Sequence, residues 1–292
     1  MADEDNKIVL ANVGHVFDHP EAVAWGPDGR AYAGGELGQV YRFGLSDQSC
    51  EQFAQVEGGL TLGMAHDADG NVYACDERHR CVHRITPGGA VAVYAKGNGE
   101  QAMRVPNYPV FDDDGNLFVS DSGDFGAKNG FIWRVAPGGA AAIWDRSANG
   151  FTNGLCLSQD GRALYVVESS PPLVSKVEIR ADGTAGRRTV VVELPRQVPD
   201  GVALDRDGNL YIAMYTPNII YRWSERGELT KLYDDWQQLQ LFAPTNLAFG
   251  GPDMRTLIIA GLGGLSVHTA RTDVPGLRLR YPRIASSERR VA

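Results

Sequence analysis

Short apolar segments alternate with polar turns along almost the whole chain. Apolar residues at 23–25 and 202–204 lead into Asp-Gly pairs, and runs rich in β-branched and aromatic residues follow, such as NVYA (71–74) and NLYIAM (209–214). An Asp-Gly pair between such runs is a strong hairpin signal. A second hairpin usually comes next, as in FIWRVAPGG (131–139). The pattern therefore predicts units of four strands, and no segment sustains the apolar spacing of a helix.

The turns recur at a nearly constant spacing. Their Asp residues stand at 28, 69, 114, 160, 207 and 253, so the steps are 41, 45, 46, 47 and 46 residues. Each inner strand carries larger groups on one face, such as Val202 and Leu204, and small ones on the other, such as Gly201 and Ala203. Strands buried on both faces need such interlocking. Six four-stranded units of this size predict an all-β fold, a six-bladed β-propeller.

The ends of the chain bear on how the ring closes. The sixth repeat runs short after Gly264, whereas the N-terminal strand KIVLANV (7–13) precedes the first complete repeat. We expect this strand to complete the last blade and close the ring. The whole of 1–292 is then one domain, with residues 1–6 and 284–292 as flexible ends.

One position of the repeat is unusual. Five of the six copies have an acidic or amide residue eight positions before the second residue of the turn. The remaining copy, the second along the chain, has Leu62 there. The five polar residues are Glu21, Asn107, Asn153, Asp200 and Asn246. Because each begins an inner strand, all six side chains should form a ring at one end of the central channel.

Ordinary hairpin turns are the simpler explanation of the Asn-Gly pair at 153 and the Asp-Gly pair at 200. Two observations favour a site instead. A proline precedes Glu21, Asn107 and Asp200, and all five polar residues share the same register. A coincidence of separate turns does not explain that register.

Composition limits the partners. The chain has 28 Lys and Arg against 36 Asp and Glu, a net charge of -8, which opposes a nucleic acid partner. No apolar run of about 18 residues suggests a membrane span. The N-terminal MADEDNKIVL lacks the order of a secretory signal, so a cytoplasmic location is expected. The four cysteines have no metal-knuckle spacing and are expected as free thiols. A small-molecule partner remains, with the oligomeric state open.

The ring predicts a metal site. Two carboxylates that converge on a partly dry site repel each other, and no ring position carries Lys or Arg. Carboxylate and amide oxygens select a hard cation, Ca²⁺ first and then Mg²⁺ or Mn²⁺, with Zn²⁺ as a further candidate. A solvated channel mouth without a ligand is the alternative.

Further residues are expected around the mouth. The strand after each turn returns to the same end. About six residues past the turn it carries Asp76, Asp121 and, with an offset of one residue, Glu168, and in the fifth blade Met214 and Tyr215. Surface polarity at a strand end is an equally good explanation of these positions. Arg104 could orient an anionic or carbonyl substrate, and His19 is a candidate general base beside Glu21, although both residue types are common at surfaces.

These motifs resemble the senescence marker protein/gluconolactonase/luciferin-regenerating enzyme family of six-bladed propellers. The resemblance rests on Pro-Glu ahead of WGPDG (25–29), Pro-Asn at 106, Asn-Gly at 153 and Pro-Asp-Gly at 199. It extends to PTNLAFGGPDMRTLIIAGLGG (244–264) and VPGLRLRYP (274–282). The resemblance implies a calcium-like cation held at Glu21, Asn153 and Asp200. The position of Asn107 would be a further ligand or a substrate contact.

The enzymes of this family are mostly lactonases, and relatives with the same ring hydrolyse phosphotriesters. This chain departs from the family at Asn107-Tyr108, where Asn-Asp is common, and its Arg104 stands farther from Asn107 than the family arginine does. Sugar-lactone specificity is therefore not implied. Tyr108 suggests a less polar substrate, part of which we expect between Leu62 and Tyr108.

The resulting hypothesis is a metal-dependent lactone hydrolase. Asp200 would be both metal ligand and proton acceptor, Glu21 and Asn153 would hold the ion, and Asn107 would contact the metal or the substrate oxygen. Asn246 and His19 would contact and orient these groups without binding the metal themselves. Three alternatives stay open: a phosphotriesterase-like hydrolase on the same metal site, a binding propeller without chemistry, and a metal-free condensing or isomerising enzyme.

Overall fold

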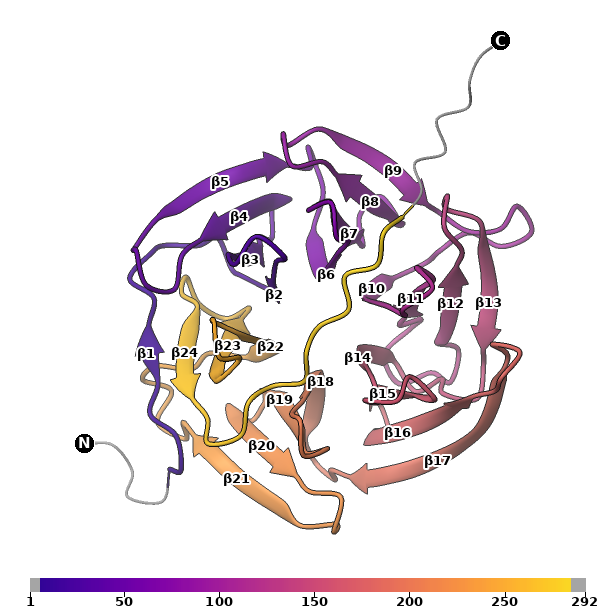
Figure 1. The fold of residues 1–292 in the computed structure, drawn as a ribbon. Helices are drawn as coiled ribbons and strands as arrows, with labels where there is room; N and C mark the ends of the chain where they lie inside the picture. Colours follow the sequence, from indigo (N-terminus) through magenta and orange to yellow (C-terminus); the bar gives the residue numbers. More distant parts are fainter. Residues whose placement is uncertain (1–5, 285–292) are drawn as a thin grey trace.

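Six antiparallel sheets of four strands surround a central channel in the computed structural model, which describes residues 6–284 (Figure 1). The blades run in chain order around the ring, and each blade begins with its innermost strand. Blade 1 comprises β2 (Ala22–Trp25), β3 (Ala31–Gly34), β4 (Gln39–Phe43) and β5 (Cys50–Gln55). Blade 2 comprises β6 (Thr61–His66), β7 (Val72–Asp76), β8 (Cys81–Ile85) and β9 (Val91–Ala95). Blade 3 comprises β10 (Pro106–Phe111), β11 (Leu117–Asp121), β12 (Phe131–Val135) and β13 (Ala141–Asp145).

The second half of the ring repeats this order. Blade 4 comprises β14 (Thr152–Leu157), β15 (Ala163–Ser169), β16 (Pro172–Ile179) and β17 (Ala185–Glu193). Blade 5 comprises β18 (Val198–Leu204), β19 (Leu210–Thr216), β20 (Ile219–Trp223) and β21 (Leu229–Asp234). Blade 6 comprises β22 (Pro244–Gly250), β23 (Thr256–Gly261), β24 (His268–Arg271) and β1 (Ala11–Asn12). The predicted six-bladed, all-β propeller is confirmed.

The N-terminal strand closes the ring as the short sixth repeat predicts. Strand β1 pairs antiparallel with β24, with Ala11 opposite Thr269 and Asn12 opposite His268. The paired segment is shorter than the predicted strand 7–13. Of the predicted flexible ends, 1–5 and 285–292 lie outside the described residues. Asn6 accepts a hydrogen bond from the Asp234 backbone, and Ile284 is buried in the core.

The turns between the first two strands of a blade are built by a local carboxylate. In blade 2, Asp67 accepts hydrogen bonds from the backbone N–H groups of Asp69 and Asn71, and from the Asn71 side chain. The sequence Asp-x-Asp-Gly-Asn recurs at 112–116 and 205–209 and makes the same bonds. This local chemistry is why the turns keep a common geometry and the repeat keeps its register.

The hydrophobic core consists of side chains packed between the faces of neighbouring blades. In the described part of the chain, each hydrophobic cluster draws on two neighbouring blades, as where Tyr73 of blade 2 meets Phe111 of blade 3 edge to face. A single blade therefore cannot bury its own faces. The small residues of the inner strands serve this contact. A Cβ on Gly154 would lie 2.6 Å from the Asp200 carbonyl oxygen, and one on Gly201 would lie 2.4 Å from that of Thr245.

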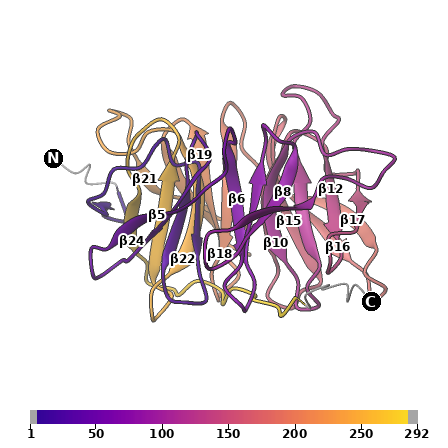
Figure 2. The same cartoon turned by 90° about the horizontal axis from the view of Figure 1, so that it is seen from above.

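The C-terminal segment covers the turn end of the channel. It runs across the centre of the ring in Figure 1 and along one edge of the disc in Figure 2, where it is drawn in yellow. Leu277 donates a backbone hydrogen bond to Leu204, the backbone oxygen of Pro282 accepts one from Ala68, and the Tyr281 hydroxyl donates to the Trp25 backbone oxygen. Between this segment and the inner strands lies an apolar cavity of about 120 Å³.

The described residues include no helix with the length and apolar character of a membrane span.

Candidate functional site

The open end of the channel forms a pocket that we call the mouth, with a volume of about 420 Å³. Five of the six predicted ring residues line it: Glu21, Leu62, Asn107, Asn153 and Asp200. Each is at least nine-tenths buried. The sixth, Asn246, does not line the mouth. It lies deeper, where its side-chain oxygen accepts a hydrogen bond of 3.5 Å from the Tyr108 hydroxyl.

Two buried carboxyl groups dominate the electrostatics of the mouth. Burial raises the pKa of Asp200 to about 8, and a hydrogen bond with the Asn153 side chain opposes that shift. Burial also raises the pKa of Glu21 well above its usual value, and the charges of Asp200 and Glu77 raise it further. Burial and mutual repulsion therefore make the ionised forms of Asp200 and Glu21 energetically unfavourable in the mouth.

No basic side chain compensates this charge. The residues that line the mouth include no lysine, arginine or histidine, and they add two more carboxylates, Glu36 and Glu77. Arg104 does not line the mouth. Its guanidinium pairs with Asp124 at 2.9 Å instead. A divalent cation would supply the missing positive charge.

The donor atoms present fit such a cation. Asn153 uses its side-chain nitrogen to donate to the Ser169 hydroxyl at 3.4 Å, which leaves its amide oxygen available to the mouth. With Asn107 and the carboxylates of Glu21 and Asp200, the set consists of oxygens alone. Oxygen ligands with two negative charges suit Ca²⁺ or another hard divalent ion.

Hydroxyl groups that the sequence analysis did not single out tie neighbouring ring positions together. Ser169 donates to the Pro199 backbone oxygen at 2.6 Å, immediately before Asp200. Thr245 donates to the backbone oxygen of Glu21 at 2.7 Å, across the junction of blades 6 and 1. These bonds hold the inner strands in register at the mouth. The sequence does offer a signal for these two contacts: Thr245 directly precedes the ring residue Asn246, and Ser169 is the last residue of the second strand of blade 4.

Asp76, Asp121 and Glu168 do not line the mouth, although all three were expected to surround it. Asp121 is fully buried and accepts hydrogen bonds from the backbone N–H groups of Arg104 and Val105 and from the Trp133 ring nitrogen. Its carboxylate holds the loop that leads to Asn107, so it positions the ring and does not contact a ligand in the mouth.

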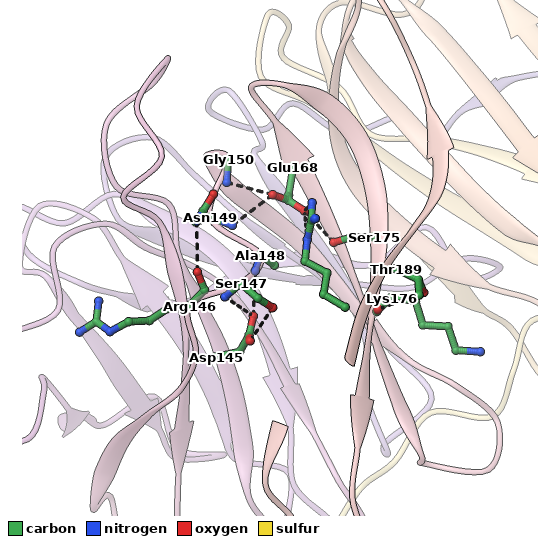
Figure 3. Close-up of polar contacts among 11 residues, drawn as sticks. Asp145, Arg146, Ser147, Ala148, Asn149, Gly150, Glu168, Ser175, Lys176 and Thr189 are labelled. Carbon is green, nitrogen blue, oxygen red and sulfur yellow. Dashed lines mark hydrogen bonds and ion pairs between the residues drawn. The ribbon is translucent and has the colours of Figure 1, made fainter. Parts of the chain in front are cut away.

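Glu168 has the same role in blade 4. Figure 3 shows its carboxylate accepting from the backbone of Asn149 and Gly150 and from the Ser175 hydroxyl. It also forms an ion pair with Arg188. The loop so held leads directly to Asn153.

Apolar side chains also line the mouth. Leu62 and Tyr215 lie there as predicted, together with Phe125 and Phe151, whose rings meet edge to face at 5.2 Å. Phe151 has a φ of 53°, in the left-handed region that non-glycine residues rarely adopt. Such strain is often found at binding sites. Tyr108 instead borders the apolar cavity at the far end, so Leu62 and Tyr108 do not share one pocket.

His19 lies beside the mouth but does not line it. Its Nδ1 is 3.0 Å from Asp18 and 3.6 Å from Glu36, and its side chain is half-exposed. The His19 imidazole is therefore held by Asp18 and Glu36, which are not among the predicted ring residues of the channel.

The match to a family model agrees with this geometry. Residues 47–262, most of the chain, match the SMP-30/gluconolactonase/LRE-like region. The chain belongs to this family. The chain is also similar to pentonolactonase XacC of Haloferax volcanii, with 22% identity over 255 residues, covering 84% of this chain and 81% of XacC. An uncharacterized protein of Sulfolobus acidocaldarius is 33% identical over 139 residues, so the chain spans about half of that relative, 49% of its length.

Solved structures of the SMP-30/gluconolactonase/LRE-like family share the fold. The gluconolactonase XC5397 of Xanthomonas campestris superposes with a TM-score of 0.77 at 20% identity, covering 92% of this chain and 90% of that one. Regucalcin of Agrobacterium tumefaciens, described as a calcium-binding protein, gives 0.74 at 15% identity, covering 95% and 97%. At these identities the structures support the propeller itself.

Proposed function

We propose that this protein is a lactone hydrolase that uses a divalent cation, with Ca²⁺ the first candidate, at the mouth. The observation that carries the proposal is the pair of buried carboxyl groups, Glu21 and Asp200, in a pocket lined by no basic side chain. The names of the relatives, pentonolactonase and gluconolactonase, supply the reaction class.

Glu21, Asn153 and Asp200 would hold the cation, with Asn107 as a fourth ligand or as a contact to the substrate oxygen. When bound, the cation would polarise the lactone carbonyl and make a nearby water more acidic. The amide oxygens complete the set without adding charge. No imidazole or thiol lines the mouth, which favours Ca²⁺, Mg²⁺ or Mn²⁺ over Zn²⁺.

The chain's own groups would handle the proton and the position of the substrate. Asp200 is the proposed acceptor for a proton from the attacking water, because it is a buried carboxylate that lines the mouth. Asn107 could donate its amide N–H to the oxygen on which negative charge develops. The C-terminal segment crosses the other end of the channel, so we take the mouth as the path for substrate and product.

The apolar residues that line the mouth suggest the substrate class. Leu62, Phe151 and Tyr215 would pack against an apolar substituent on the lactone ring, while the carboxylates repel anionic substrates. A neutral lactone with an alkyl or aryl substituent fits better than a sugar acid derivative. This preference comes from Phe151 and Tyr215, because Tyr108 lies at the far end of the channel.

The test is a substrate panel on chelator-treated protein. Aldonolactones, alkyl-substituted lactones and aryl phosphotriesters would each be assayed without metal and with Ca²⁺, Mg²⁺, Mn²⁺ or Zn²⁺. We expect hydrolysis of the alkyl lactones, lost on chelation and restored by Ca²⁺. Hydrolysis of the phosphotriesters alone would replace the lactonase proposal, and no hydrolysis with any metal would favour a binding propeller.

A further inference from the structure

A second group of metal-ligand side chains lies on blade 2, outside the five ring residues. We call Asp76, His79 and His83 the rim cluster. Asp76 Oδ2 is 2.5 Å from His79 Nδ1 and 3.0 Å from His83 Nε2. These three ligand atoms all lie within 4.8 Å of one another. Asp76 and His83 are buried, whereas the His79 side chain is 44% exposed.

The two oxygens of Asp76 have separate partners. Oδ1 accepts hydrogen bonds from the backbone N–H groups of Leu60 and His79, at 3.1 and 3.2 Å. Oδ2 faces both imidazoles. The carboxylate is thus fixed in orientation by the backbone, with one oxygen presented to two ring nitrogens. Orientation of a ligand by its own hydrogen bonds is typical of metal sites.

Comparison with blade 3 shows that a carboxylate at this position does not need two histidines. Asp121 occupies the same place at the end of the second strand, accepts from two loop N–H groups, and takes one further hydrogen bond from Trp133. Trp133 holds the third position of β12, as His83 holds the third position of β8. Blade 2 therefore replaces an indole with an imidazole, and its turn adds a second imidazole, His79. Neither change is required by the structural role that blade 3 illustrates.

We propose that the rim cluster is a Zn²⁺ site, with Asp76 Oδ2, His79 Nδ1 and His83 Nε2 as the three protein ligands and water in the fourth position. Two imidazoles and a carboxylate form a donor set that suits zinc, in contrast to the all-oxygen mouth. The open position faces the side on which His79 is exposed.

The geometry needs little adjustment. With zinc–ligand bonds of about 2.0–2.2 Å, the ligand atoms of a tetrahedral site lie roughly 3.3–3.6 Å apart. The observed separations of 2.5 and 3.0 Å are shorter, as expected where the imidazoles donate hydrogen bonds to Oδ2 in the absence of metal. Because His79 lies in the turn between β7 and β8, it can move outward by the small distance required.

Cys81 is close but is not assigned as a ligand. Its sulfur lies 3.3 Å from His83 Nε2, and it stands opposite Asp76 in the strand ladder. Its sulfur does not belong to the group of ligand atoms that all lie within 4.8 Å of one another, which Asp76, His79 and His83 form. A Cys81→Ser variant should therefore retain zinc.

The rim cluster lies next to the mouth, so zinc bound there would affect the structure of the mouth. Asp76 holds the backbone of Leu60, and both Leu60 and Glu77 line the mouth. Zinc would therefore fix the side of the mouth next to Leu62. It would do so without using any of the proposed ligands of the mouth cation.

The test is zinc titration of the chelator-treated full chain by calorimetry, in excess Ca²⁺ so that the mouth is saturated, with metal content measured after gel filtration. The native protein should bind one Zn²⁺. His79→Asn, at a half-exposed position, should fold normally and weaken binding about tenfold or more. His83→Gln should do the same. The controls Cys81→Ser, His15→Asn and Asp200→Asn should each bind zinc as the native protein does.

Co²⁺ provides a second readout. Bound in place of zinc, it should give the intense visible bands of a tetrahedral ion in the native protein and lose them in His79→Asn. Undiminished zinc binding in both His79→Asn and His83→Gln would overturn the proposal. Loss of zinc only in Asp200→Asn would also overturn it, because that result would place the ion in the mouth.

Discussion

The charge of Asp200 raises the pKa of Glu21, although the two side chains belong to blades 5 and 1. Both carboxyl groups are buried, and neither has an ion-pair partner among residues 6–284. Without a cation the mouth cannot hold both charges cheaply. This electrostatic relationship leads to the first two predictions.

The stability of the metal-free protein should fall as the pH rises from about 5 to 9. Both groups have a folded pKa above the unfolded value, so the folded state binds more protons and this stabilisation is lost as the pH passes through about 8. The loss is on the order of several kcal/mol, at about 1.4 kcal/mol for each pKa unit. Thermal unfolding with and without Ca²⁺ measures it. The Ca²⁺-induced rise in Tm should be larger at pH 8 than at pH 6, and an equal rise at both would contradict the argument.

Asp200→Asn should abolish cation binding in the mouth and reduce lactone hydrolysis by about a hundredfold or more. The substitution removes a charge that burial disfavours, so the metal-free variant should unfold at a higher temperature than the metal-free native protein at pH 8. Asp207→Asn is the matched control, because Asp207 is exposed at the turn end of the same blade. A variant at 200 with native activity would remove Asp200 from the mechanism.

Gly154→Ala should destabilise the protein by about 1–3 kcal/mol, because the new methyl would meet the Asp200 carbonyl oxygen at 2.6 Å. The displaced strand would also move Asp200, so cation affinity should fall with stability. Urea unfolding and calorimetry measure the two effects. Gly88→Ala is the control, since the nearest atom to its Cβ is 3.9 Å away. Equal stability of the two variants would show that the inner strands are not in tight contact.

Phe151→Ala should lower kcat/KM for alkyl-substituted lactones by about tenfold, through loss of apolar contact area in the mouth. Unsubstituted small lactones should be affected much less. Trp236→Ala removes an exposed aromatic side chain that does not line the mouth and should leave both substrates unaffected. If Phe151→Ala reduces both substrates equally, Phe151 supports the strand and does not select the substrate.

Glu168→Gln should cost about 3–5 kcal/mol of stability, because it removes the charge of a buried carboxylate and leaves Arg188, whose side chain is 24% exposed, without its charged partner. Activity per folded molecule should change far less than in Asp200→Asn, since Glu168 positions the loop to Asn153 and does not reach the mouth. The comparison separates a positioning residue from a substrate contact. A selective rise in KM without loss of stability would favour the substrate contact.

The repeat made most of the fold predictable. Because the turns recur at a nearly constant step, with their Asp residues at 28, 69, 114, 160, 207 and 253, the number of blades, the strand order and the place of the ring residues all follow from spacing. Ring closure followed as well, since a repeat that lacks its last strand must obtain one from elsewhere. Spacing also placed Glu21, Asn153 and Asp200 in one pocket.

The side chains around the ring were harder to predict. Asp121 and Glu168 do end strands that return toward the mouth, but loop N–H groups need acceptors there and the carboxylates turn to them. A spacing argument does not detect that demand. The positions of the Tyr108 side chain and of the C-terminal segment could not be predicted from the sequence either. Both depend on contacts between parts of the chain that are far apart in sequence and that the repeat does not specify.

The measurement that tests the central claim most directly is a Ca²⁺ titration of chelator-treated protein, with cation binding and hydrolysis of an alkyl-substituted lactone followed on the same samples. The account predicts that activity rises from baseline in proportion to the occupancy of one site, and that Asp200→Asn shows neither binding nor activity. Full hydrolysis by the metal-free protein, or Ca²⁺ binding at the mouth without any change in rate, would contradict it.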